Sequence, residues 1–165
     1  MDEFGLLDLQ PFSDDDLAPP PAGPMPKGDY HAKLSEVEVR EKENGVQLML
    51  LWTDFTPCKD DGNDYSRRRI YQGEWVIHKN EQAQRIGRTR LTQAGKALGL
   101  ATQTEVNGKT GWALPVVTTV QELHEHFAQQ LGAQCTIYVS QRKRSDNGEL
   151  ENTVGSVKPL GSENA

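Results

Sequence analysis

The sequence has little of what catalytic, disulfide-bonded and metal-binding proteins need. Its two cysteines, Cys58 and Cys135, are too few for a disulfide framework, and neither has an evident base beside it. The histidines His124 and His126 lie two residues apart on a predicted helix, where they point different ways, so they do not have zinc-ligand spacing. Gly95-Lys96 lacks the rest of a phosphate-binding glycine loop. We therefore expect no enzyme, no cofactor and no bound metal ion.

Long apolar runs are missing as well. No stretch approaches the ~20 residues that a helix needs to span a bilayer. The acidic N-terminus also lacks the apolar core of a secretory signal. We expect a soluble protein in a reducing compartment, the cytoplasm, with no membrane partner.

Positive charge is absent from the first 26 residues. Residues 1–26 hold six acidic side chains among large apolar ones and end near the run Pro19-Pro20-Pro21, which favours extended polyproline structure. Acidic segments with interspersed apolar residues are usually disordered and used as docking peptides. We predict a disordered tail over residues 1–26; the alternative is a tail that only improves solubility. The predicted docking residues are Phe4, Leu7, Phe12, Asp14, Asp15 and Asp16.

The net negative charge of the sequence comes from the tail, and the rest of the chain is neutral. The whole sequence has a net charge of −6 with 24 acidic residues, but without the six in the tail, residues 27–165 hold 18 acids against 18 bases. Within them, Ser66–Leu100 has eight basic residues against two acidic ones and also carries Tyr71 and Trp75. A basic, aromatic segment in a neutral domain indicates a surface for a polyanion, most simply nucleic acid.

Hydrophobic periodicity predicts five strands and two helices. The predicted strands are residues 30–40, 46–55, 67–77, 134–144 and 150–160. In the first of them the alternation changes phase after Leu34, which predicts a bulge or bend. An amphipathic helix with a basic outer face is predicted over 81–98, ended by Gly99, and a second helix over 119–132, ended by Gly132. Residues 101–117 between them are predicted to be irregular.

Three strands, a helical interlude and a two-stranded hairpin form the element order of an OB-type barrel. The predicted architecture is therefore mainly β with two helices: a five-stranded OB-type barrel over residues 27–160, with a helical insertion between strands three and four. The disordered acidic tail precedes this domain, and a short tail, residues 161–165, follows it. A mixed sheet with helices is the alternative.

Binding of single-stranded nucleic acid needs cations for the phosphates and flat side chains on which bases stack. Tyr71, Trp75 and Tyr138 are predicted to stack, because each lies on a predicted strand near basic residues. The predicted phosphate contacts are Arg67, Arg68, Arg69, Lys79, Arg85, Arg88, Lys96, Arg142, Lys143 and Arg144. Two alternatives stay open: Trp75 could be a core residue, and Arg67–Arg69 could pair with the acidic loop at 60–64. Arg90 breaks the helix pattern and is predicted to form a structural ion pair or cap.

Several short motifs are shared with a known family. They are Gly28-Asp29-Tyr30, Trp75-Val76-Ile77, Asn80-Glu81, Ala97-Leu98-Gly99, Leu131-Gly132 and Val157-Lys158-Pro159-Leu160. Through them the chain resembles a bacteriophage family of small uncharacterised proteins associated with replication and recombination genes. The resemblance implies a single-stranded-DNA-binding or recombination-associated OB-type protein in the cytoplasm of the host cell.

The expected function is therefore largely sequence-independent binding of single-stranded DNA in phage replication and recombination. The alternative is a non-catalytic accessory protein that modulates a phage recombinase or nuclease. Phe12–Leu17 resembles the acidic, aromatic-tipped tail by which bacterial single-strand-binding proteins recruit partners. By that resemblance, phage or host replication and recombination proteins are the candidate partners of the tail.

Overall fold

The structure, a computed structural model, describes residue 11 and residues 23–161. Over these residues the chain is mainly β with two helices, as predicted. The strands are β1 (Gly28–Lys42), β2 (Gly45–Pro57), β3 (Ile70–His78), β4 (Thr102–Val106), β5 (Lys109–Ala113), β6 (Gln134–Lys143) and β7 (Leu150–Pro159). The helices are α2 (Glu81–Leu98) and α3 (Val120–Ala128). The predicted docking residues Phe4, Leu7, Phe12, Asp14, Asp15 and Asp16 lie outside the described residues.

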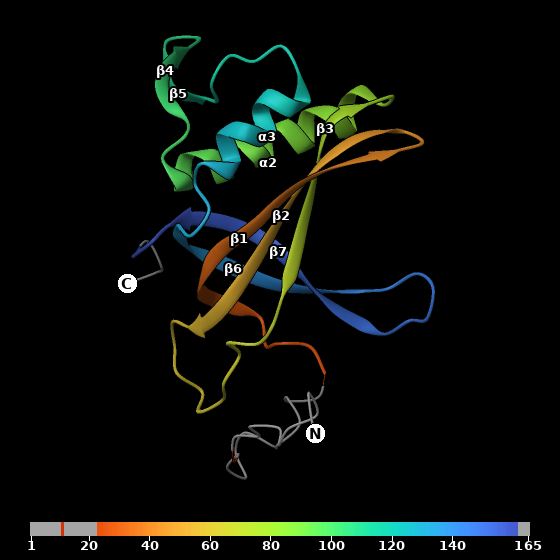
Figure 1. The fold of residues 1–165 in the computed structure, drawn as a ribbon, viewed down its shortest axis with the longest axis vertical. Coiled ribbons are helices and arrows are strands. Elements are labelled where there is room, and N and C mark those ends of the chain that lie inside the picture. The colour runs from red at the N-terminus through yellow and green to blue at the C-terminus, as the bar shows by residue number, and fades with distance from the viewer. Residues whose placement is uncertain (1–10, 12–22, 162–165) are drawn as a thin grey trace, which may run out of the picture.

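Five of the strands form one antiparallel sheet with the order β3-β2-β1-β6-β7, and β4 and β5 form a second, two-stranded sheet. The two helices and the small sheet are inserted between the third and fourth strands of the main sheet. Figure 1 shows the main sheet strongly twisted, with both helices at one end of it. The predicted order of elements is therefore confirmed, with the small sheet as an addition.

The central strand, β1, pairs with two strands at once. Its first part, Gly28–Lys33, pairs with β6 on one side, while most of the strand pairs with β2 on the other. The register against β2 shifts between His31 and Lys33, and again between Leu34 and Glu36. These shifts lie next to the phase change seen in the sequence, so the predicted bulge is confirmed.

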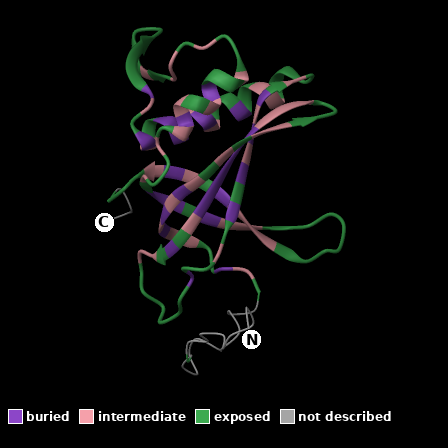
Figure 2. Cartoon of the chain, viewed as in Figure 1, coloured by how far each residue is buried: buried purple, intermediate pink, exposed green. Residues whose placement is uncertain are grey.

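The core lies on the inner side of the main sheet, beneath the helices. The alternation of β2 sends Leu48, Leu50 and Trp52 into the core. Met49 and Leu51 on the other face are buried as well, so the middle of this strand is buried on both faces. The Trp52 side chain is fully buried, and its indole N–H donates to Gln72 Oε1 at 2.9 Å, so its polar group is satisfied. Figure 2 shows the buried residues concentrated in the sheet and on the helix sides facing it. The helices contribute Leu91, Ala94, Leu98, Leu123 and Phe127.

Local capping signals explain the bounds of α2, which match the prediction. The side chain of Asn80 accepts a hydrogen bond from the Ala83 N–H at 2.9 Å and so satisfies one of the free donors of the first turn. Gly99 ends the helix in the left-handed conformation with φ of 85°.

The second helix is shorter than predicted. It begins as expected, with the Thr119 side chain accepting from the Glu122 N–H at 3.1 Å. It ends at Ala128, however, and not near Gly132. The reason is tertiary: the Gly132 N–H donates to the carbonyl oxygen of Leu34 in β1 at 2.8 Å, and this contact draws the chain away from the helix axis.

One side chain of α2, Arg90, joins the two edge strands of the main sheet. β3 and β7 are in contact but share no backbone pairing in the described part of the chain. The Arg90 Nε donates to Glu74 of β3 at 2.7 Å, and the terminal nitrogens donate to the carbonyl oxygens of Val154 (2.6 Å) and Gly155 (3.1 Å) of β7. Gln72 also donates to Glu74, at 2.8 Å. We name this group the Arg90 clasp; the predicted structural ion pair of Arg90 is confirmed.

The folded part begins earlier than the predicted boundary at residue 27. Met25 is fully buried in the core. Its N–H donates to Asn152 Oδ1 at 2.7 Å, and its carbonyl oxygen accepts from Asn152 Nδ2 (2.9 Å) and Gln141 Nε2 (2.8 Å). The segment just before β1 is therefore fastened to β6 and β7 by side chains more than a hundred residues away.

The third strand starts later than predicted. The prediction began it at residue 67, but β3 begins at Ile70, and the basic triplet Arg67–Arg69 precedes it. Tyr65 forms an isolated bridge with Phe55, and the chain then turns, with the Arg68 N–H donating to the Tyr65 carbonyl oxygen at 3.0 Å. The triplet thus belongs mainly to a loop.

The prediction of irregular structure at 101–117 is wrong, because this region contains the β4–β5 hairpin. Its turn residues Asn107 and Gly108 have φ of 52° and 76°, the pair of left-handed conformations typical of a two-residue hairpin loop. Every residue of the two strands is exposed except the half-buried Gly111. A hairpin without a buried face has no apolar periodicity, so periodicity could not reveal it.

Candidate nucleic-acid interface

The outward side of β3 carries two aromatic residues on a flat support. Tyr71, Gly73 and Trp75 point away from the core, and Tyr71 is 46% exposed while Trp75 is half-buried. A Cβ at Gly73 would lie 2.7 Å from the Met49 sulfur, so the Met49 side chain of β2 covers this glycine closely. Tyr71 and Trp75 lie four residues apart on β3, and this spacing on a strand separates them by about 13 Å. Tyr71, Met49, Gly73 and Trp75 therefore form an aromatic surface with an apolar centre, which we name the β3 face.

Arginines lie at the edge of the β3 face. The guanidinium carbon of Arg40 is 5.8 Å from the centre of the Tyr71 ring, within cation–π range. Arg40 also pairs with Glu38, and Arg69 pairs with Glu36, each at 3.2 Å. All four charged groups are substantially exposed. Exposed ion pairs contribute about 0–1 kcal/mol, so a phosphate can replace either carboxylate at small cost.

Trp75 is held in place by its neighbours. Its ring lies against that of His78, with centres 4.4 Å apart and planes at 74°. The His78 Nδ1 accepts from the Asn80 N–H at 2.9 Å, so the proton of the neutral imidazole is on Nε2. On the other side, Gly87 of α2 approaches the Trp75 backbone so closely that a Cβ there would lie 2.2 Å from the carbonyl oxygen. The Trp75 backbone is thus packed against α2, and its indole lies against His78 with part of the side chain open to solvent.

The β6–β7 hairpin carries the third predicted aromatic residue. Tyr138 is exposed on β6, and its ring covers Gly155 of β7, where a Cβ would lie 2.8 Å from Tyr138 Cδ1. Arg142 pairs with Glu151 at 2.7 Å. Figure 1 shows this hairpin projecting toward the same side of the view as the β1–β2 hairpin.

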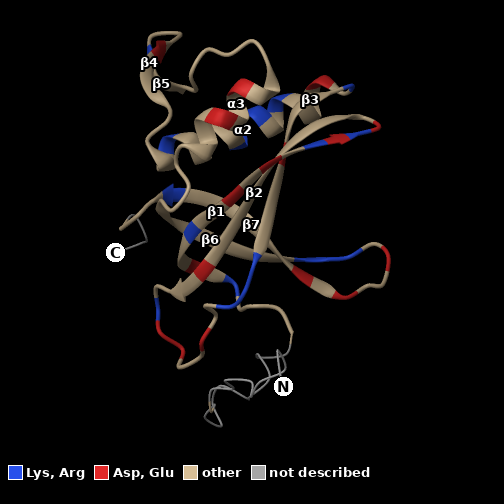
Figure 3. Cartoon of the chain, viewed as in Figure 1, with Lys and Arg blue, Asp and Glu red and all other residues tan. Residues whose placement is uncertain are grey.

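The tip of the β6–β7 hairpin holds a bidentate ion pair. Arg144 donates to both carboxylate oxygens of Asp146, from Nε at 3.0 Å and from Nη2 at 2.7 Å. The hydrogen bond from Arg144 lowers the pKa of the Asp146 carboxyl, and the same bond raises the pKa of Arg144. Figure 3 shows basic residues along the β6 arm of the hairpin and acidic residues at its tip and on the β7 arm.

The predicted cations of α2 form a separate group. Arg85, Arg88 and Lys96 are exposed, but Arg88 also donates from Nε to the Val76 carbonyl oxygen of β3 at 2.7 Å. Lys96 lies over the ring of Trp112 in β5, with its nitrogen 4.6 Å from the ring centre. These residues thus lie on α2, with Arg88 next to the Trp75 end of β3 and Lys96 at the other end of the helix.

The remaining predicted cations have different surroundings. Lys79 is exposed in the turn before α2. Arg68 donates to the carbonyl oxygen of Gly23 at 2.8 Å. Arg67 is exposed beside Asp64, whose pKa is lowered first by the N–H of Ser66 and in smaller part by the charge of Arg67. This proximity of Arg67 to Asp64 is one contact between the basic triplet and the acidic loop.

Two residues of this surface were missed by sequence reasoning. Arg40 of β1 and Tyr71 of β3 lie close together because both strands pair with β2 in the sheet. Sequence spacing does not show that proximity. Trp112 lies in a region predicted to be irregular, although the Asn107-Gly108 turn in the same stretch was a usable hairpin signal.

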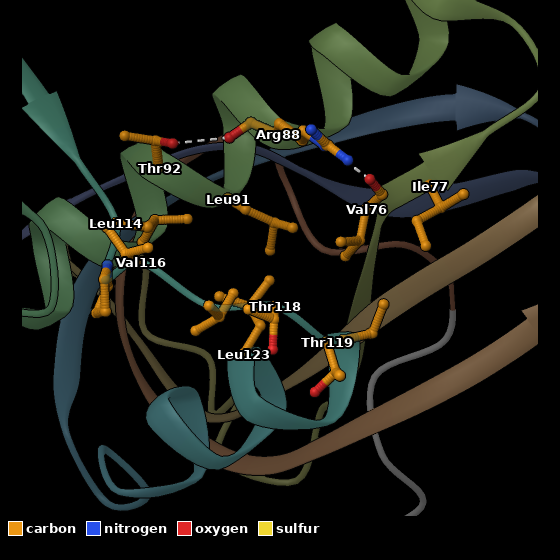
Figure 4. Close-up of a pocket in the computed structure, with 13 residues that line it drawn as sticks. Val76, Ile77, Arg88, Leu91, Thr92, Leu114, Val116, Thr118, Thr119 and Leu123 are labelled. Carbon is orange, nitrogen blue, oxygen red and sulfur yellow. Dashed lines mark hydrogen bonds between the residues drawn. The ribbon is translucent and has the colours of Figure 1, made fainter.

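A pocket of about 410 Å³ opens between α2, α3 and the segment before α3. Apolar residues such as Leu91, Leu114 and Leu123 line it, and Figure 4 shows Arg88 at its edge. No His, Cys, Asp or Glu is among its lining residues. Among the described residues, no group of three or more such side chains could hold a metal ion, and neither helix is long and apolar enough to cross a bilayer.

No protein-family model and no curated protein matches this chain. What the fold and the surface define directly is a mainly-β protein that presents an aromatic face bordered by arginines. Its function is therefore inferred from its own residues.

Proposed function

We propose that this protein is a non-enzymatic, single-stranded-DNA-binding protein that contacts DNA with little sequence preference through the β3 face. The observation that carries the proposal is the pair Tyr71 and Trp75, which point outward from one strand on either side of an apolar support. Aromatic rings accept any base, because every base has a flat π-surface, and arginines at the edge supply the contacts to phosphates.

The strand arrangement supports an OB-type barrel. The order β3-β2-β1-β6-β7, with β3 and β7 in contact and a helix between the third and fourth strands, matches the order expected of a five-stranded barrel, and the side-chain link between β3 and β7 through the Arg90 clasp supports closure. OB-type barrels bind oligonucleotides on their second and third strands and on the adjoining hairpin loops. In this chain those elements are β2, β3 and the hairpins β1–β2 and β6–β7, where Arg40, Arg142 and Arg144 lie.

The biological setting is part of the same proposal. The resemblance to the bacteriophage family supports a role in phage DNA replication and recombination in the host cytoplasm. The acidic, apolar composition of residues 1–26 supports docking of a replication or recombination protein by the tail.

One observation favours the alternative, an accessory protein that modulates a phage recombinase or nuclease and touches DNA weakly. Arg69, Arg142 and Arg144 are already paired with carboxylates. A surface whose cations are partly neutralised by carboxylates attracts DNA less strongly than one with unpaired cations.

Anisotropy of a fluorescein-labelled oligo-dT, titrated with the full-length protein at low and high salt, tests the proposal. We expect binding that weakens with salt, since each phosphate contact adds about 0.7 to the slope of log affinity against log salt for a single strand. Loss of one base–aromatic stack costs about 1–3 kcal/mol, so Tyr71→Ala should weaken binding about five- to 150-fold. Leu131→Ala, which removes an exposed apolar side chain elsewhere, is the control.

Absence of binding at low salt would overturn the proposal, as would equal affinity of the wild type and a Tyr71→Ala/Trp75→Ala double variant. Cleavage of the oligonucleotide in the presence of a divalent metal would instead make the protein a nuclease.

A further inference from the structure

We propose that the outer side of α2 and the β4–β5 hairpin form a second contact for the same DNA strand, with Trp112 as a stacking residue. The proposal rests on the proposed function and adds to it a binding surface outside the barrel. Its residues are Arg85, Arg88, Thr92, Lys96 and Trp112, referred to as the α2 track.

The helix geometry places the cations of the α2 track on one side. Arg85, Arg88, Thr92 and Lys96 follow one another at intervals of three or four residues, which puts them on neighbouring turns of one helix flank. From Arg85 to Lys96 the helix rises about 16 Å. The buried residues of α2, including Gly87 and Leu91, lie toward the sheet. A single strand lying along this flank therefore meets successive cations.

The α2 track begins where the β3 face ends. α2 crosses β3 at Trp75, since a Cβ on Gly87 would lie 2.2 Å from the Trp75 carbonyl oxygen. The next helix residue, Arg88, donates to the Val76 carbonyl oxygen at 2.7 Å (Figure 4). Thr92 donates its hydroxyl to the Arg88 carbonyl oxygen at 2.8 Å. DNA that leaves the aromatic pair on β3 at the Trp75 end thus arrives at the basic flank of the helix.

At the far end of the α2 track, the β4–β5 hairpin holds an indole over the helix. Trp112 is 38% exposed, and Lys96 lies 4.6 Å from its ring centre. A surface hollow of about 380 Å³ lies beside the ring, between Trp112, Lys96, Gln93, Thr92 and Thr89. A hollow next to an exposed indole, with a cation at its edge, has the shape and charge that one stacked nucleotide needs.

The β4–β5 hairpin lies outside the core and contacts the C-terminal part of α2. Its strands contribute nothing to the core, and it is fastened to the C-terminal end of α2 by Trp112 and by Leu114, which follows β5. A Cβ on Gly95 would lie 2.3 Å from Leu114 Cδ2. The absence of a side chain at Gly95 therefore leaves room for Leu114 to pack against the helix. The fold thus builds a two-stranded sheet whose one large aromatic ring lies at the end of a basic helix flank.

Affinity for oligo-dT of two lengths tests the proposal. One OB-type barrel covers about 4–16 nucleotides, so an oligonucleotide of about 6 nucleotides occupies the β3 face and one of about 20 also reaches the α2 track. We expect Trp112→Ala to weaken binding of the long oligonucleotide about five- to 50-fold and to leave the short one unchanged. Trp112→Phe should retain most of the affinity. Val106→Ala, which removes an exposed apolar side chain from the same hairpin, is the matched control.

The outcomes separate this proposal from the proposed function. Equal affinity of wild type and Trp112→Ala for the long oligonucleotide overturns the α2 track, provided Tyr71→Ala weakens both lengths. If Trp112→Ala weakens both lengths equally, Trp112 is not a distal contact and the proposal is also overturned. No binding of either length by the wild type ends both proposals. Since Trp112 lies outside the core, the far-ultraviolet circular dichroism of each variant should match that of the wild type.

Discussion

The Arg90 clasp gives the clearest prediction for stability. Arg90→Met removes three hydrogen bonds that join β3 to β7 and leaves the Glu74 carboxylate, whose side chain is 9% exposed, without its cation. Removal of one partner from a buried ion pair costs about 3–5 kcal/mol. Because the Arg90 side chain is itself 31% exposed, water can reach part of the site, and we expect a loss near the lower limit.

A second substitution separates two contributions to the loss of stability: the unpaired charge of Glu74 and the lost hydrogen bonds of Arg90. Glu74→Gln removes the charge but keeps an oxygen that can accept from Gln72, as the carboxylate does at 2.8 Å. The double variant Arg90→Met/Glu74→Gln should therefore be more stable than Arg90→Met alone, by about 1–3 kcal/mol, the cost of leaving a buried polar group unsatisfied. The stability of Arg90→Lys should lie between those of the wild type and Arg90→Met, because one ammonium cannot reach both strands with the geometry of a guanidinium.

Urea denaturation followed by circular dichroism measures these differences as free energies of unfolding. Gln93→Ala, at an exposed position of the same helix, serves as the control for an ordinary surface substitution. If Arg90→Met changes the free energy of unfolding by less than about 0.5 kcal/mol, as ordinary surface substitutions do, the clasp does not hold the edge strands together. A double variant less stable than Arg90→Met would show that the unpaired Glu74 carboxylate is not the main cause of the loss of stability.

Three further predictions follow from close contacts and buried groups. Gly87→Ala should destabilise the fold by about 1–3 kcal/mol in urea denaturation, despite the better helix propensity of alanine, because the added Cβ would lie 2.2 Å from a β3 carbonyl oxygen. At pH 8 the native protein should show one reactive thiol toward Ellman's reagent, that of the half-buried Cys58, since burial raises the pKa of Cys135 to about 11; two fast thiols would contradict this. The hydroxyl of Tyr65 donates to Asp61 at 2.7 Å and lowers the pKa of that carboxyl, so this stabilisation is present above the ordinary aspartate pKa and is lost as the pH falls through the lowered value. The stability difference between wild type and Tyr65→Phe should therefore shrink in strong acid, and a difference independent of pH would exclude this origin.

Local signals explain why α2 could be predicted to the residue. Asn80 and Gly99 act through contacts within a few residues of themselves, and such contacts depend little on the rest of the fold. The same holds for the bulge in β1, which appears in the sequence as a change of alternation.

The features that sequence could not reveal depend on contacts between distant segments. Met25 is buried in the core, and its backbone is bonded to the side chains of Asn152 and Gln141, which lie more than a hundred residues away. Arg90 could be recognised as structural from its place on the apolar side of the helix, but its carboxylate partner, Glu74, lies on another element. For the β3 face, alternation identified Tyr71 as outward, whereas the nearby Arg40 depended on strand order, which a single sequence does not give.

The central place of β1 affects how the chain folds during synthesis. β1, β2 and β3 are made first and can pair as neighbours, but one edge of β1, Gly28–Lys33, has to wait for Gln134–Lys143. Pairings so distant in sequence form slowly, because the entropy of closing the loop is lost before the contact is gained. Until β6 arrives, that edge exposes unpaired N–H and C=O groups to other chains. An incomplete chain that stops before β6 therefore carries an open sheet edge and is prone to aggregate.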